Sequence, residues 1–278
     1  MSSEQLENKI SERRLFLIVE VAGQNFGLEA LKVKEIIAVP TITKVPRTKS
    51  VIRGLIKLRE QIIPLLDTRQ RLSFRSVESE DNDLVELLKA RKQDHINWVD
   101  TLLNSVMEQK EFTLQNDPSK CNFGKWYYSF KTDNVVLADL LDKFELPHSK
   151  IHRYAERVKK AIQNEGYDTA LELCNQARDK ELKQLVRLFD NLITNIKATR
   201  KEFAVVYELE HETVALSVDK VHFIAEVQQD QIKSLGEYNK NSEFARGICY
   251  VNETSFIILD DSVTQVNSTV PTLEDAIA

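Results

Sequence analysis

Cysteine is scarce in this 278-residue chain, which has only three, Cys121, Cys174 and Cys249. They are odd in number and widely spaced, which excludes a disulfide framework and is typical of a reducing compartment. A cysteine with a special role would then be a metal ligand or a reactive thiol.

Long apolar runs are also missing, and so is any excess of basic charge. The first fourteen residues alternate charges, and no window approaches the ~18 apolar residues of a membrane span. These absences exclude a secretory signal and direct membrane insertion, and they predict a cytoplasmic protein. The formal net charge is −5, and basic residues are nowhere gathered with interleaved aromatics, so nucleic-acid binding is disfavoured.

The apolar residues that are present form a repeat. Residues 14–21 and 25–28 predict two strands around a turn, and residues 203–209 and 213–216 predict the same pair again. The likeness continues at a constant offset of 188, at which Leu28, Lys32, Val33 and Ile36 correspond to Leu216, Lys220, Val221 and Ile224.

A second pair of segments strengthens the repeat. RGLIKLREQIIPLLD, residues 53–67, lies over RGICYVNETSFIILD, residues 246–260, with Arg-Gly, one glutamate and Leu-Asp in common. Each copy spans only about sixty residues, a length at which a single core is marginal. We therefore expect the two copies to pack together as one β domain.

The segment between the copies has a different period. Over residues 84–199 apolar residues recur about every 3.6 positions among helix-forming residues, which predicts a helical domain inserted into the β domain. Residues 73–83 are polar and acidic and are expected to form the first linker. Residues 197–202 are expected to form the second linker, which leads back into the β domain, and residues 264–278 a frayed tail.

The β segments resemble the CheW-like family of chemotaxis coupling proteins. The resemblance rests on Leu-Lys-Val-Lys-Glu-Ile at residues 31–36 and on the Arg-Gly hairpin of residues 53–67, and it covers residues 14–72 and 203–263. It implies two small SH3-like β-barrel lobes, here interrupted by a helical bundle. The family usually has Asn-Leu-Arg-Gly at the hairpin turn, where this chain has Lys-Leu-Arg-Glu at residues 57–60.

The resemblance also implies a function without an active site. Such proteins bridge the cytoplasmic tips of chemoreceptors to a CheA-like sensor histidine kinase. Arg59 matches the receptor-facing arginine of the family, and Val33, Glu35 and Ile36 match a segment of its partner-binding surface. The alternative is ordinary strand packing for Val33 and Ile36 and a solvated side chain for Arg59.

Within the predicted helical domain, His148 and His152 are four residues apart behind Pro147. This spacing puts both imidazoles on one helix face, one turn apart, which is a chelating arrangement. Zinc takes four nitrogen or sulfur donors, and the segment offers three more donors in His95, Cys121 and Cys174.

His95 and Cys121 are the better candidates. His95 shares a helix face with apolar residues that point inward, namely Leu84, Leu88, Trp98, Leu102 and Val106. Cys121 precedes Asn122 and Gly124, which are expected to break the helix and leave the thiol on a turn.

The order His95, Cys121, His148 and His152 resembles the chemoreceptor zinc-binding domain, a small helical bundle with three histidines and one cysteine around Zn²⁺. That resemblance covers residues 84–199 and implies these four residues as the metal ligands, with no catalytic residue. Cys174 and Cys249 are expected to be core residues.

Three imidazoles and one thiolate complete a tetrahedron and leave no position for an activated water, which argues against hydrolysis. A metallohydrolase that uses the three histidines and a water in place of Cys121 stays as an alternative, although no His-Glu-x-x-His motif is present. A purely structural zinc is a third reading. The leading hypothesis is that oxidation of Cys121 or loss of zinc shifts the β lobes between which the bundle is threaded. A homodimer through the helical insert is left open.

Overall fold

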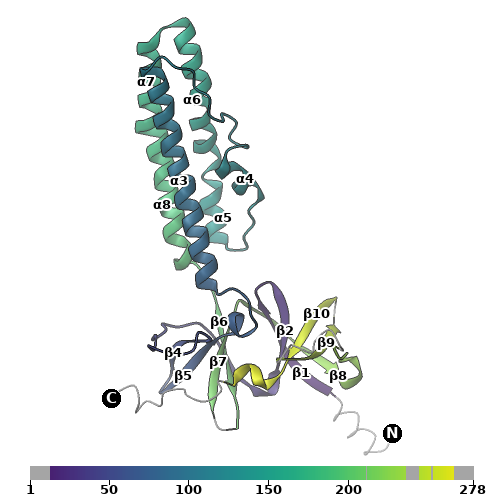
Figure 1. Cartoon of the computed structure of the whole chain (residues 1–278). Coiled ribbons are helices and arrows are strands. Elements are labelled where there is room, and N and C mark those ends of the chain that lie inside the picture. Colours follow the sequence, from purple (N-terminus) through teal and green to yellow (C-terminus); the bar gives the residue numbers. More distant parts are fainter. Residues whose placement is uncertain (1–12, 211, 236–243, 252, 266–278) are drawn as a thin grey trace, which may run out of the picture. The chain divides into compact units, whose positions relative to one another are not determined.

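The computed structural model describes residues 13–265 except for residues 211, 236–243 and 252. It divides into two compact units (Figure 1). Unit 1 consists of Met1–Val77 and Lys201–Ala278, and unit 2 is Glu78–Arg200. No helix among the described residues is long and apolar enough to cross a membrane.

The described residues of unit 1 contain ten strands in two five-stranded sheets. The first run of chain provides β1 (Arg13–Val21), β2 (Gln24–Glu29), β3 (Val33–Ala38), β4 (Ile52–Leu58) and β5 (Gln61–Asp67), with short helices η1 (Ala30–Lys32) and α2 (Thr68–Arg71). The second run provides β6 (Phe203–Glu208), β7 (Thr213–Val218), β8 (Lys220–Gln228), β9 (Ala245–Val251) and β10 (Thr254–Leu259), with short helices η3 (Gln229–Gln231) and η5 (Asp261–Thr264).

The two copies of the repeat exchange strands. One sheet has the order β8-β1-β2-β10-β9 and the other β3-β6-β7-β5-β4, so each order becomes the other when the copies are swapped. In each sheet one copy's first hairpin pairs in parallel with the other copy's last strand, β2 with β10 and β7 with β5. Neither copy can complete a sheet alone, which explains why two marginal sixty-residue units occur in one chain.

Each sheet curls into a small barrel. Thr43, after β3, forms a bridge to Leu55 on β4, the far strand of its sheet, and Lys233 forms the equivalent bridge to Ile248 on β9. The expected two-lobed β fold with a helical insertion is thereby confirmed.

The close approach of the backbone at these bridges requires the glycine of the shared Arg-Gly motif. A Cβ on Gly54, whose φ is +148°, would lie 2.5 Å from the carbonyl oxygen of Thr43. A Cβ on Gly247 would lie 2.8 Å from the carbonyl oxygen of Lys233. A side chain at either position would push the bridging segment away, so the barrel closure depends on glycine.

The aspartates that end the two segments cap the helices that follow. Asp67 accepts a hydrogen bond from the backbone N–H of Gln70 at 3.0 Å, and Asp260 accepts one from Ser262 at 2.9 Å. A carboxylate at an N-cap satisfies an otherwise unpaired donor, so the Leu-Asp motif marks the end of a strand and the start of a helical turn.

The central strands are buried on both faces. On β1, Phe16 and Ile18 belong to the core of one barrel, whereas Leu17 and Val19 belong to a second cluster shared with the other sheet. That shared core contains residues of both sheets, among them Phe26, Leu28, Leu66, Val205, Leu216 and Val218. Burial on two faces explains the near-continuous apolar run of residues 15–21.

A buried ion pair also joins the sheets. The guanidinium of Arg69, in α2, donates to both carboxylate oxygens of Asp219 at 2.8 and 3.0 Å, and the Asp219 side chain is only 15% exposed. Asp219 also accepts a hydrogen bond from the backbone N–H of Ala22, in the β1–β2 turn. Loss of one partner from such a pair leaves a buried charge uncompensated, which typically costs about 3–5 kcal/mol.

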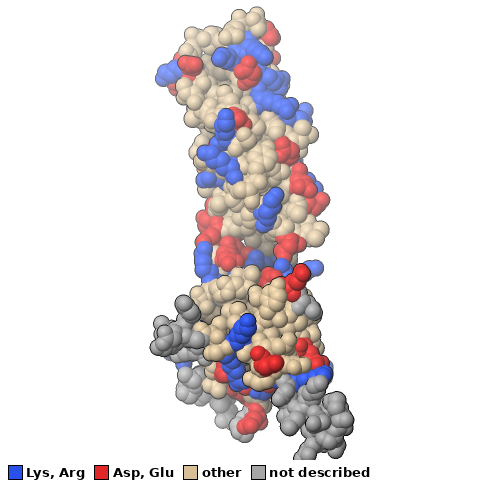
Figure 2. Space-filling view, turned by 90° about the vertical axis from the view of Figure 1, so that its right-hand side faces the viewer, with Lys and Arg blue, Asp and Glu red and all other residues tan. Residues whose placement is uncertain are grey.

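Unit 2 is helical, and its helices enclose one apolar core. They are α3 (Val77–Met107), α4 (Asn122–Ser129), α5 (Val135–Asp142), α6 (Glu145–Asn164), α7 (Tyr167–Gln176), the π-helical turn η2 (Ala177–Leu182) and α8 (Lys183–Ala198). Figure 2 shows basic and acidic side chains interspersed along these helices on the face that it displays.

The structure corrects two expectations about the insertion. Residues 73–83 are not a linker throughout, because α3 begins at Val77; Glu78 and Glu80 lie in its first turn, where the helix dipole favours acidic residues. The insert is also not threaded between the lobes, since it leaves after β5 and returns into β6, which belong to the same sheet. Most of the predicted tail lies outside the described residues.

We expect Gly54→Ala to destabilise the β unit by about 2 kcal/mol or more, because its Cβ meets backbone that cannot yield without opening the barrel. Gly23→Ala is the matched control, since Gly23 has φ +77° but open space, and should cost only about 1 kcal/mol. Both tryptophans lie in unit 2, so tryptophan fluorescence would not report on unfolding of the β unit. Amide hydrogen exchange of β4 is therefore the suitable measurement. Equal exchange rates in the two variants would contradict the steric argument.

Candidate metal centre

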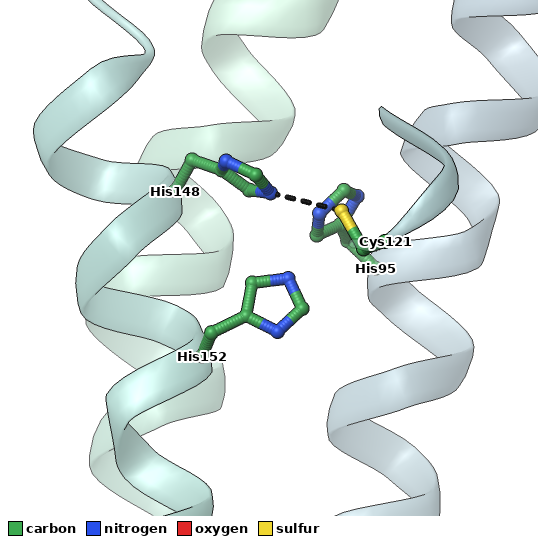
Figure 3. A group of neighbouring side chains, drawn as sticks. All are labelled: His95, Cys121, His148 and His152. Atoms are coloured by element: carbon green, nitrogen blue, oxygen red, sulfur yellow. Dashed lines mark hydrogen bonds between the residues drawn. The ribbon is translucent and has the colours of Figure 1, made fainter. Parts of the chain in front are cut away.

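Four predicted ligands converge inside the helical unit. His95 comes from α3, Cys121 from the turn before α4, and His148 and His152 from α6 (Figure 3). One donor atom from each lies within 4.8 Å of the others. Among the described residues this is the group of histidine, cysteine or carboxylate side chains that could hold a metal ion.

The two α6 histidines lie on the buried face of their helix. His148 and His152 are 0% and 2% exposed, and Ile151 and Ala155 share that face. Pro147 stands in the first turn of α6, which begins at Glu145, where the missing N–H of proline costs no helical hydrogen bond. The four-residue spacing therefore places both imidazoles one turn apart against the bundle core, as the sequence predicted.

His95 is fixed by its own helix. Its Nδ1 lies 2.7 Å from the backbone carbonyl of Arg91, and because a carbonyl only accepts, Nδ1 must carry the proton. This tautomer leaves Nε2 unprotonated and therefore able to bind a metal, and Nε2 is buried without a hydrogen-bond partner. Metal-bound histidines are typically held in this way by a carbonyl on the second nitrogen.

Cys121 is the N-cap of α4. Its sulfur accepts a hydrogen bond from the backbone N–H of Gly124 at 3.2 Å and lies 3.2 Å from Nε2 of His148 (Figure 3). The expectation that Asn122 and Gly124 break a helix is wrong, because they form the first turn of α4. A helix N-terminus directs N–H groups at the sulfur, which favours its thiolate form.

Gly124 holds this turn in place. A Cβ at residue 124 would lie 1.9 Å from the backbone carbonyl oxygen of Pro118. The turn that presents Cys121 can approach α4 only because residue 124 has no side chain. The glycine of the Cys-Asn-Phe-Gly sequence is thus a requirement of the cysteine's position.

Aromatic side chains wall the group. The rings of Phe123 and His148 are 4.9 Å apart, those of Trp98 and His152 are 5.0 Å apart, and Phe189 of α8 lies against His95. These apolar walls remove water from the imidazoles. They also make the group stiff, since packed aromatic rings leave little room for other rotamers.

Burial keeps the histidines neutral. Burial, and then the neighbouring His95 and His152, lowers the pKa of His148 to about 3. Burial, and then His95, lowers the pKa of His152 to about 4, and burial also lowers the pKa of His95. Burial raises the pKa of the Cys121 thiol, against the effect of the Gly124 and Phe123 N–H groups. Neutral imidazole is the form that binds metal.

Four ring nitrogens of the group lack hydrogen-bond partners. Nε2 of His95, Nδ1 of His148 and both ring nitrogens of His152 are buried without one. The Gln115 carbonyl lies near His152 and opposes the fall in its pKa, but the well-formed hydrogen bond that it accepts comes from the Trp98 indole N–H at 2.9 Å and not from His152. Buried polar atoms without partners are unfavourable, and a cation at the centre of the group would satisfy one nitrogen of each ring.

The donor set fits zinc. Nitrogen and sulfur are its usual ligand atoms, and neighbouring ligand atoms in a tetrahedral zinc site lie about 3.3–3.6 Å apart. The donor atoms span at most 4.8 Å, so side-chain rotation and a small contraction suffice to bring them to that spacing. No carboxylate belongs to the group among the described residues.

The other singled-out residues are dispersed. Cys174 is 0% exposed on α7 and Cys249 is 2% exposed on β9, so their assignment to the core is confirmed. In the β unit, Arg59 lies 3.4 Å from Glu35, so two of the residues predicted to bind partners are neighbours. Ile36 is 40% exposed, whereas Val33 packs against the shared core.

Sequence reasoning missed Glu181. This glutamate lies in the π-helical turn between α7 and α8, is 5% exposed, and has one carboxylate oxygen buried without a partner. Its residue type and spacing give no signal that separates it from the exposed glutamates of the same helices.

Comparison with known families agrees with this architecture. The CheW-like domain matches residues 15–117 and 182–264, more than half of the chain. The protein belongs to the CheW-like family. The chemoreceptor zinc-binding domain matches residues 95–159, a range that contains all four converging side chains.

Curated relatives of this CheW-like protein are CheW proteins. Chemotaxis protein CheW of Klebsiella aerogenes is 32% identical over 73 residues, which cover 26% of this chain and 44% of that protein. Chemotaxis protein CheW of Bacillus subtilis is 26% identical over 112 residues, or 40% of this chain and 70% of that protein. The chain thus spans less than half the length of the first relative.

A solved structure with a similar chain is the scaffolding protein TtCheW from Thermoanaerobacter tengcongensis. The identity is 14% and the TM-score 0.44, with 92% of this chain and 95% of that chain covered. Similarity at this level does not bear on function.

We expect Gly124→Ala to weaken zinc binding about 10- to 100-fold, because the added Cβ displaces the turn that presents Cys121. Lys125→Ala changes an exposed neighbour on the same helix and should leave zinc affinity unchanged. Competition against a chromophoric chelator measures both. Equal affinities in the two variants would show that the turn does not position the sulfur.

Proposed function

We propose that this CheW-like protein is a non-catalytic cytoplasmic adaptor, which couples chemoreceptors to a CheA-like sensor histidine kinase. We further propose that it holds one zinc ion through His95, Cys121, His148 and His152. The observation that carries the proposal is the convergence of these four side chains within a segment inserted into a CheW-like β unit.

The adaptor role is supported by the β unit. Ile36 on the edge strand β3 is 40% exposed, and Arg59 in the neighbouring turn is 80% exposed with φ +53°. Both side chains are accessible to a partner, and arginine is enriched in binding hot spots. The hairpin turn lacks the glycine that the family usually has there. The turn forms without it, because Arg59 itself adopts the left-handed backbone conformation.

The zinc would supply a closed, charged centre that cross-links α3, α4 and α6. Three imidazoles and one thiolate leave no open position for water, so the centre is suited to stabilising a fold or to responding to an oxidant, and not to hydrolysis. The sulfur is the oxidisable donor, and its conversion to a sulfenic acid would remove the thiolate that zinc requires. We infer that release of Cys121 frees the N-terminus of α4, which it caps.

The metallohydrolase alternative is less well supported. It needs a water where the Cys121 sulfur lies, only 3.2 Å from His148 Nε2. It also needs a general base, and the nearby Asp94 forms an ion pair with Arg91 at 3.2 Å.

We expect Ile36→Ala and Arg59→Ala each to weaken binding of a receptor tip fragment or of the kinase about tenfold, because each removes a side chain exposed on the proposed surface. Ile224→Ala is the matched control, since Ile224 is the counterpart of Ile36 in the other copy of the repeat and is 60% exposed on β8. Titration calorimetry with each purified partner provides the measurement. Binding that ignores both substitutions would refute this surface, and a wild-type protein that binds neither partner would refute the adaptor role.

We expect Cys121→Ser to weaken zinc binding by at least about tenfold and to abolish zinc release by hypochlorite, because serine supplies no thiolate. Cys174→Ala should retain both properties, since Cys174 lies in the core outside the group. Zinc release is followed with a fluorescent chelator and compared with kinase affinity under the same treatment. A kinase affinity that stays constant while zinc is lost would leave the metal purely structural.

A further inference from the structure

A second candidate site lies at the other end of α4 from Cys121. A partly open cavity of about 350 Å³ is lined by the C-terminal half of α4, by residues 130–132 that follow it, by α5 and by the first turn of α6. Its walls include three aromatic side chains, Tyr127, Tyr128 and Phe130, together with Leu141. Cavities of this volume that combine aromatic side chains with polar groups can hold a small molecule.

The polar groups of the cavity are mainly acidic. Asp142 and Glu145 both line it, and the Tyr128 hydroxyl donates a hydrogen bond to Oε1 of Glu145 at 3.2 Å. The negative field is visible at Tyr127, where burial, and then Glu145 and Asp142, raises the pKa of the phenol to about 12. One cation, Lys131, also borders the cavity, so the formal charge of the lining is −1.

This combination selects a chemical class. Aromatic faces and carboxylates both attract cations, and they repel anions. A bare metal ion would need more oxygen donors than two carboxylates at the rim provide, whereas an alkylated ammonium ion places its methyl groups on aromatic rings. We propose that this cavity, between α4, α5 and α6, binds a small organic cation of the quaternary or alkylammonium class.

The cavity shares two helices with the metal centre. Tyr127 and Tyr128 lie on α4, whose N-cap is Cys121, and Glu145 lies one turn before His148 on α6. A ligand that draws α4 and α6 together would change the positions of Cys121 and His148 relative to each other. Binding at the two sites is therefore coupled, and by linkage the coupling is reciprocal.

The test is titration calorimetry of the full chain with choline chloride, against its neutral isostere 3,3-dimethylbutan-1-ol and against sodium chloride. We expect saturable binding of choline and at least about tenfold weaker binding of the isostere, since only choline carries the charge. Absence of saturable choline binding at 50 mM, on the order of the weakest affinities of a specific site, would overturn the proposal. Equal binding of the isostere would overturn it as well.

Variants locate the site and guard against misfolding. Tyr128→Ala and Glu145→Gln should each weaken choline binding about tenfold, whereas Val135→Ala, at an exposed position of α5 outside the lining, should not. Lys131→Ala should strengthen binding, because it removes the one competing cation, and a gain cannot result from misfolding. Choline binding that persists unchanged in all three variants of the lining would place it elsewhere and overturn the assignment.

The coupling has its own measurement, which rests on the proposed zinc site. Choline affinity is compared between zinc-loaded protein and protein treated with a chelator, and we expect it to differ by at least about threefold. Equal affinities would remove the coupling. Choline binding to the cavity and zinc binding to the four ligands are measured separately, so failure of either proposal is recognised independently of the other.

Discussion

The helical unit depends on how four side chains that could bind a metal are buried together. Three imidazoles and a thiol stand within 4.8 Å of one another behind aromatic walls, and four of the imidazole nitrogens have no hydrogen-bond partner. A folded protein tolerates such a cluster poorly unless something satisfies it. A cation at the centre would satisfy one nitrogen of each ring and would tie α3, the α4 turn and α6 to a single point. Structural zinc contributes on the order of 10 kcal/mol in small domains, enough to decide whether such a unit folds.

The helical unit is inserted between two strands of one sheet. The helical unit leaves after β5 and returns into β6, two strands that flank β7 in one sheet. Within unit 2 the ends are joined, since Lys197 donates to Asn82 at 2.7 Å and Arg200 contacts Asp81 and Glu80 at 3.5 Å. The chain connects these joined ends to β5 and β6. The same sheet carries β3, the edge strand of the proposed partner surface.

Much of this arrangement was predictable from the sequence, for identifiable reasons. The repeat and its hairpins follow from strand periodicity, and the His148–His152 pair follows from helical spacing. The exchange of strands between the copies was not predictable, because two copies with the same apolar pattern offer the same edges to each other as to themselves.

The other expectations from the sequence that the structure corrected were wrong for physical reasons. Acidic residues before an apolar run can be a linker or a helix N-terminus, and here Glu78 and Glu80 belong to the helix. Asn122 and Gly124 look like helix breakers, but glycine at 124 is required by the carbonyl of Pro118 and not by a turn. The cavity beside α4 depends on how three helices pack, which no local pattern records.

The central claim is tested most directly by X-ray absorption at the zinc edge, together with metal analysis, on protein purified from its native host without added metal. The account predicts one zinc per chain with three nitrogen ligands near 2.0 Å and one sulfur near 2.3 Å, to within about 0.2 Å. A first shell without sulfur would contradict it, and so would protein that is folded and free of metal.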